Sequence, residues 1–142
     1  MTRVTAADIS AMSKRNGGNE PLDVHLEAAL AWLEPDEELL WCVDYADMEQ
    51  KFGPSCMLLV TPRRLVVQRL EGLTARKPTI YEVAMEEVLV AIDFPKPVMF
   101  GLMKNHHLVV QARPGRIVLQ DLRDEQVAAA VEVINAAAVD AG

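Results

Sequence analysis

The feature that most constrains the fold is a pair of apolar segments joined by a short turn, over residues 56–69. Both segments, Cys56–Val60 and Leu65–Arg69, are rich in Val and Leu, and Pro62 between them presets a backbone angle suited to a chain reversal. Their centres are apolar at successive positions, which indicates burial on both faces of a sheet. This stretch therefore predicts a β-hairpin.

Five further segments have the composition of strands, which makes seven with short connections. They are Glu38–Ala46, Lys77–Ala84, Val88–Phe94, His107–Ala112 and Arg116–Gln120. In the third of these, Val88, Val90, Ile92 and Phe94 alternate and are expected on one face, and the prolines at 95 and 97 are expected to end the strand.

Two amphipathic helices are predicted, one before the strands and one after them. Apolar residues repeat at helical spacing over 21–34, and again over Asp124–Ala138. Residues 1–20 are expected to form a flexible segment, in which Val4–Met12 can form a short helix. The predicted organisation is this segment, a helix over 21–34, and a domain over 35–142. Strands closed by one helix predict an α+β fold in which the helix plugs a curved antiparallel sheet.

The composition disfavours several classes of binding partner. A net charge of −7 over 142 residues disfavours nucleic-acid binding and electrostatic adhesion to anionic lipid. No apolar run approaches the roughly 20 residues of a membrane span, and no apolar core of signal-peptide length precedes Asp8, so a cytoplasmic protein is expected. Cys42 and Cys56 are expected to be buried thiols; a disulfide stays open, subject to strand register.

Catalytic patterns are absent from the sequence. No serine lies in a nucleophile elbow, and no glycine-rich phosphate loop occurs. His106 and His107 are adjacent, so on a strand they point to opposite faces and cannot share a metal, and His25 is remote. Acidic residues over 36–38 and 86–87 fall at turns, where solvation and capping explain them. We therefore expect no enzyme, no cofactor and no metal.

Two motifs resemble the bacterial pleckstrin-homology-like domains, in particular the YokE-like group. They are Leu33-Glu34-Pro35-Asp36-Glu37-Glu38 before the first strand and Leu58-Leu59-Val60-Thr61-Pro62-Arg63-Arg64-Leu65 in the hairpin. Tyr81 and Val83 ahead of Glu87-Val88 also match, and the similarity covers residues 33–139. It implies about seven antiparallel strands in two nearly orthogonal sheets, capped by the C-terminal helix, with the helix of 21–34 as an addition. It implies no conserved enzymatic activity, and some relatives form rings.

Two parts of the sequence are candidates for a binding site, and the first is the basic turn of the hairpin. Eukaryotic members bind inositol phosphates through basic residues around the first two strands, but here residues 44–53 hold three acids and one lysine, Lys51, which disfavours a lipid headgroup. Arg63 and Arg64 at the hairpin turn are either solvated turn residues or a contact for an anion or acidic protein.

The second candidate is the connection Asp93–Lys104, which is expected to be a loop. It contains apolar residues where polar ones are usual: Phe94, Val98, Met99, Phe100, Leu102 and Met103. These residues either close one end of the barrel or form an exposed docking patch. The favoured function is a non-enzymatic module that binds a protein or itself, through sheet edges and this loop. The alternative is a lipid- or small-anion-binding module.

Overall fold

The computed structural model describes residues 3–46, 55–70, 77–98, 103–120 and 122–142. Two helices, α1 (Ala6–Arg15) and α2 (Asp23–Trp32), precede the strands. The strands are β1 (Trp41–Ala46), β2 (Ser55–Val60), β3 (Arg64–Leu70), β4 (Thr79–Ala84), β5 (Val88–Val98), β6 (Met103–Ala112) and β7 (Arg116–Leu119). A 3-10 turn, η1 (Met85–Glu87), lies between β4 and β5, and α3 (Asp124–Ala141) ends the chain.

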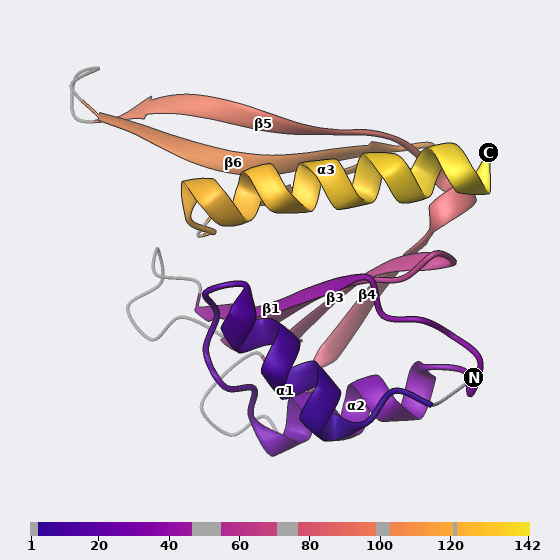
Figure 1. Cartoon of the computed structure of the whole chain (residues 1–142). Coiled ribbons are helices and arrows are strands. Elements are labelled where there is room, and N and C mark those ends of the chain that lie inside the picture. Colours follow the sequence, from indigo (N-terminus) through magenta and orange to yellow (C-terminus); the bar gives the residue numbers. More distant parts are fainter. Residues whose placement is uncertain (1–2, 47–54, 71–76, 99–102, 121) are drawn as a thin grey trace.

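The strands form two antiparallel sheets that lie one above the other (Figure 1). Sheet A has the order β1-β2-β3-β4 and sheet B has the order β5-β6-β7. The predicted hairpin is β2–β3, with Leu58 opposite Val67. Seven strands, two sheets, the C-terminal helix and a helix ahead of the strands confirm the predicted α+β architecture.

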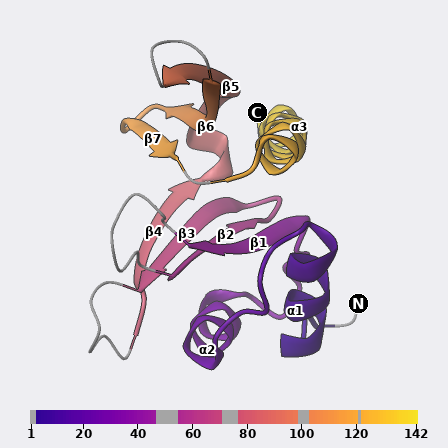
Figure 2. The same ribbon diagram turned by 90° about the vertical axis from the view of Figure 1, so that its left-hand side faces the viewer.

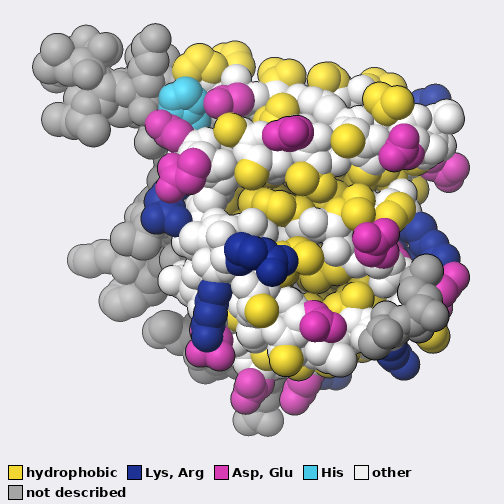
Figure 3. Space-filling model, viewed as in Figure 1, with side chains coloured by type: hydrophobic (Ala, Val, Ile, Leu, Met, Phe, Trp, Pro, Cys, Tyr) yellow, Lys and Arg dark blue, Asp and Glu magenta, His cyan; other side chains and the backbone are white. Residues whose placement is uncertain are grey.

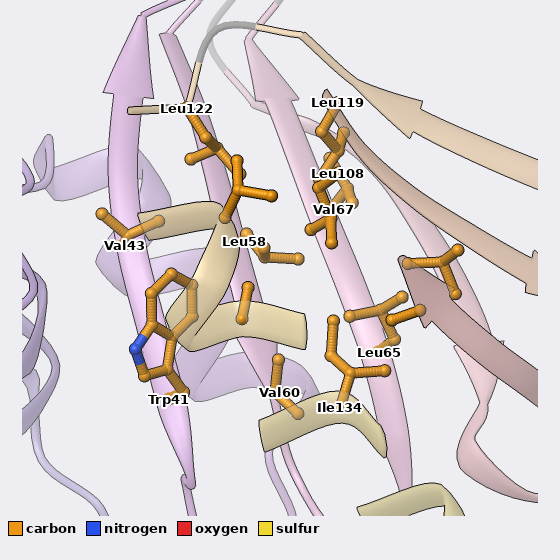
Figure 4. Packing of buried hydrophobic residues seen from close by; sticks show 14 of the residues in the cluster. Trp41, Val43, Leu58, Val60, Leu65, Val67, Leu108, Leu119, Leu122 and Ile134 are labelled. Atoms are coloured by element: carbon orange, nitrogen blue, oxygen red, sulfur yellow. The ribbon is translucent and has the colours of Figure 1, made fainter. Parts of the chain in front are cut away.

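The main core lies between the two sheets and α3 (Figure 4). Side chains from β1, β2 and β3 meet side chains from β6 and α3, and Leu58, Leu108 and Ile134 are fully buried there. The apolar positions of α3 recur at helical spacing, so one face of the helix plugs the space between the sheets, as predicted.

A second core covers the other face of sheet A. Cys42, Met57, Leu59 and Val66 point away from sheet B and pack against α1 and α2. Sheet A is therefore buried on both faces, which explains why β2 and β3 are apolar at successive positions.

The first 20 residues differ from the expected flexible segment. Ala6–Arg15 form helix α1, and Ile9 is completely buried in the second core. The helix begins with a capping box, in which Thr5 Oγ1 accepts from the Asp8 backbone N–H and Asp8 Oδ2 accepts from the Thr5 N–H. Hydrogen bonds from the backbone N–H and the side chain of Thr5 lower the pKa of the Asp8 carboxyl. Helix α1 is therefore a packed part of the fold.

Strand β5 is longer than predicted. Pro95 and Pro97 do not end it, and it pairs with β6 as far as Val98. Ala91 directs its backbone N–H and C=O away from β6, and residues 95 and 97 share that direction by alternation. A proline there removes no hydrogen bond between the strands. Much of the expected loop is therefore a continuation of the β5–β6 hairpin.

A β-bulge changes the predicted face of β5. The register shifts between Val88 and Val90, so Val88 is buried in the main core, whereas Val90, Ile92 and Phe94 are 40–50% exposed on the outer face. The prediction that all four share one face is wrong, because one extra residue in a strand reverses the alternation beyond it.

Candidate interaction surfaces

The two arginines of the hairpin turn face the segment that precedes β1. Arg63 Nη2 donates to Asp36 Oδ2 at 2.7 Å, in an exposed pair. Arg64 holds Glu37 by two hydrogen bonds, Nε to Oε2 at 2.9 Å and Nη2 to Oε1 at 2.8 Å. Its Nη1 also donates to Glu82 at 3.0 Å. The two sequence motifs that carry the resemblance are thus in direct contact.

Glu37 is the buried member of this cluster. Its side chain has no exposed surface, and Thr61 Oγ1 donates to Oε2 at 2.6 Å. Burial works to raise the pKa of this carboxyl, but the hydrogen bonds from Thr61 and Arg64 prevail and hold it below the ordinary value. Arg64 also lies 5.1 Å above the Trp32 ring, a cation–π distance. Glu37 was expected to be a solvated turn residue, which is wrong.

This cluster bears on the predicted anion contact. Both guanidinium groups have carboxylate partners, so an anion would have to compete with Asp36, Glu37 and Glu82. The lysine at position 51 lies outside the described residues. The cluster joins the β2–β3 turn to the segment before β1 and contributes to the fold.

The outer face of sheet B is an exposed apolar surface. Val90, Ile92 and Phe94 lie along β5, Val118 lies on β7, and Val109 is nearly buried between them on β6. Figure 3 shows hydrophobic side chains along the upper edge of the molecule, over β5 and β6. Helices cover the outer face of sheet A, but no described element covers this face (Figure 2).

The predicted patch residues divide into three groups. Phe94 is half exposed on this outer face. Val98 and Met103 pair with each other at the end of the β5–β6 hairpin. Met99, Phe100 and Leu102 lie outside the described residues. Ile92 and Val118 are surface residues that no sequence pattern reveals, because both have the apolar character of core residues.

Two sheet edges are closed by groups from the helical part of the chain. On β5, the Asn135 amide of α3 accepts from the Ala91 N–H at 2.8 Å and donates to the Ala91 C=O at 2.9 Å. On β1, Asn16 Nδ2 donates to the Cys42 C=O, and Ser13 Oγ accepts from the Asp44 N–H. These bonds occupy backbone groups that a partner strand would need.

The edge of β4 lies beside a groove. Helix α2 covers the middle of sheet A and leaves a groove of about 490 Å³ between itself and β4. Its lining is mostly apolar: Val24, Ala28, Ala31, Trp32, Pro78 and Ile80, with Glu27 and Lys77. The volume lies within the range of small-ligand sites.

A polar network beneath α2 accounts for the buried histidine. Gln68 Oε1 accepts from the Trp32 indole at 2.8 Å, and Gln68 Nε2 donates to the His25 C=O at 3.0 Å. His25 Nε2 lies 3.1 Å from Ser55 Oγ. Burial lowers the pKa of His25, so the ring is neutral near pH 7. The network ties α2 to β2 and β3.

Asp44 is the least satisfied buried group among the described residues. Its side chain is 4% exposed, and Oδ2 has no hydrogen-bond partner there. Burial raises the pKa of this carboxyl to about 7, although a hydrogen bond from the Asn19 side chain works in the opposite direction. No sequence pattern marks this group, because Asp44 is only one of the three acids of residues 44–53 and nothing local indicates that its side chain is buried.

The cysteines and histidines do not converge on a reactive site. Cys42 belongs to the second core and Cys56 to the main core, and both are free thiols. His106 Nδ1 lies 2.7 Å from Asp93 Oδ1 and is partly exposed, whereas His107 is buried. Within the described ranges, no group of three or more His, Cys, Asp or Glu side chains is placed to hold a metal ion. None of the described helices is long and apolar enough to span a membrane.

The arrangement of sheets and helix has a counterpart among solved structures. A pleckstrin homology domain from Shewanella amazonensis SB2B matches with a TM-score of 0.58 at 16% sequence identity. The match covers 81% of this chain and 96% of that domain. The chain therefore has a pleckstrin-homology-like fold. No protein-family model matches the sequence, and no curated protein matches it. Membership of the YokE-like group stays a prediction.

Proposed function

We propose that this chain is a non-enzymatic protein-interaction module, which associates with a partner protein or with itself through the outer face of sheet B. The observation that carries the proposal is the exposed row Val90, Ile92 and Phe94, extended across Val109 to Val118. Water contact with apolar surface is unfavourable by roughly 25 cal/mol per Å², so covering these side chains favours association. Contiguous exposed apolar surface of this kind often marks an interface.

The charge on this face supports self-association. The described side chains on the outer face include Arg116 and His107 but no carboxylate. Two copies of a chain with net charge −7 repel each other through their acidic surfaces. A contact through a face without carboxylates brings apolar side chains together and avoids that repulsion.

The experiment compares the association of the wild-type chain with that of Ile92→Lys. Sedimentation velocity on the wild type is expected to show a species larger than the 15.7 kDa monomer, and Ile92→Lys is expected to shift it to monomer. The matched control is Val139→Lys, because Val139 is 78% exposed near the end of α3, a helix that packs on the inner face of sheet B and not on its outer face. Equal association of both variants would contradict the proposal for self-association.

The alternative function is a lipid- or small-anion-binding module. It has less support, because Arg63 and Arg64 are already paired with carboxylates. Sedimentation with vesicles of anionic lipid tests it. Co-sedimentation that is lost in Arg63→Glu would favour this alternative over the protein-interaction proposal.

A further inference from the structure

We infer that the edge of β4, together with the groove beside α2, binds an extended peptide of a partner protein as an added strand. The two features are adjacent, since Ile80 belongs both to β4 and to the lining of the groove. This surface lies on sheet A and is separate from the outer face of sheet B. The inference stands without the proposed function.

The hydrogen-bond directions along sheet A identify the groups that β4 presents. Met85 N–H donates to the Arg63 C=O, and the pairs Leu65–Val83 and Val67–Tyr81 continue the same ladder. The backbone groups of Val83 and Tyr81 therefore point to β3, and those of Ile80 and Glu82 point away from the sheet. Within the part of the chain that the structure describes, no hydrogen bond reaches these outward groups.

The other edges are less suited to an added strand. Asn16 and Ser13 occupy the backbone groups of β1, and Asn135 occupies those of Ala91 on β5. Further along β5, the outward positions 95 and 97 are prolines, which have no N–H to donate. Strand β7 has only four residues. Among the four edges, β4 combines outward backbone groups with a neighbouring pocket.

The groove defines the chemistry of the peptide. A strand added to β4 places every second side chain on the face of sheet A that carries Ile80, beside α2. Ile80 is 43% exposed there, and Ala28 and Ala31 leave room for a bulky side chain. The groove carries one acid, Glu27, and one base, Lys77, so it selects no net charge. The expected ligand is an extended segment with a large aliphatic or aromatic residue, and main-chain bonds supply part of the affinity.

The test starts from peptides selected from a random 12-residue phage-display library on the full chain. The backbone variant is Glu82→Pro, which removes one outward N–H while sparing the ladder to β3. Its matched control is Glu82→Gln, which also loses the ion pair with Arg64 but keeps the N–H. A selected peptide, made synthetically, is expected to bind Glu82→Gln nearly as tightly as the wild type and Glu82→Pro at least tenfold more weakly.

Two further measurements keep the inference falsifiable if Glu82→Pro does not fold. Ala31→Leu fills the groove from α2 and is expected to weaken binding at least tenfold. Amide hydrogen exchange is expected to slow at Ile80 and Glu82 when the peptide binds. Failure to select any peptide, unchanged affinity for these variants, or loss of binding in Ile92→Lys alone would overturn the inference. The last outcome would leave the proposed function intact.

Discussion

The buried carboxylate of Asp44 leads to a quantitative prediction about pH. The unfolded chain titrates this group near 3.9, whereas burial raises its pKa to about 7 in the folded protein. Each unit of difference corresponds to about 1.4 kcal/mol, so the ionised group lowers the free energy of unfolding by roughly 4 kcal/mol above pH 7. The side chain is 4% exposed, so solvent screens little of this effect.

The sign follows from proton binding. Between pH 4 and pH 7 the folded state holds the Asp44 proton and the unfolded state releases it, so the contribution of this group to stability falls as pH rises. Asp44→Asn removes the titration. When both proteins are moved from pH 4.5 to pH 8, we expect the free energy of unfolding of the variant to rise by about 3 kcal/mol relative to that of the wild type.

Urea unfolding followed by tryptophan fluorescence measures this difference, because Trp32 and Trp41 lie in the two cores. His25 titrates in both proteins and cancels from the comparison. Asp140→Asn, at an exposed position near the end of α3, controls for the change in net charge. A difference between variant and wild type that stays constant from pH 4.5 to pH 8 would refute the argument that burial dominates at Asp44.

Two further predictions concern the ion-pair cluster and the thiols. Arg64→Ala removes the charged partner of the buried Glu37 and leaves the Thr61 hydroxyl beside it. The variant is expected to lower the free energy of unfolding by about 3–5 kcal/mol, whereas Arg63→Ala, which breaks an exposed pair, is expected to lower it by less than about 1 kcal/mol. Equal losses in urea titrations would show that Glu37 gains little from Arg64. Burial raises the pKa of the Cys42 thiol to about 12, and Cys56 is also buried. Neither thiol is therefore expected to react with a thiol-specific disulfide reagent at pH 8 until the protein unfolds. Rapid labelling of the native protein would contradict this prediction.

The sequence is sufficient to predict the helices and strands whose sequence patterns are local. The β2–β3 and β6–β7 hairpins, and the helix that begins at Asp124, follow from composition, turn residues and apolar spacing. The double burial of sheet A was also visible, because β2 and β3 are apolar without alternation.

The features that sequence analysis missed depend on contacts between distant residues. Pro95 is compatible with β5 only because its nitrogen points away from β6, which no local pattern reveals. The bulge beside Leu89 decides whether Ile92 faces the core or solvent, and nothing in the composition marks it. Glu37 is buried because Arg64, 27 positions along the chain, is its partner. The candidate surfaces on sheet B and β4 therefore required the structure.

The double burial of sheet A also has a consequence for mutational tolerance. Strand β2 is buried without interruption from Cys56 to Val60, since odd and even positions belong to different cores. A saturation scan of this strand should show a continuous block of intolerant positions, in place of the every-second-residue pattern of an ordinary surface strand. Shortening the chain to the strands and α3 would remove α1 and α2 and turn half of that block into solvent-exposed apolar surface.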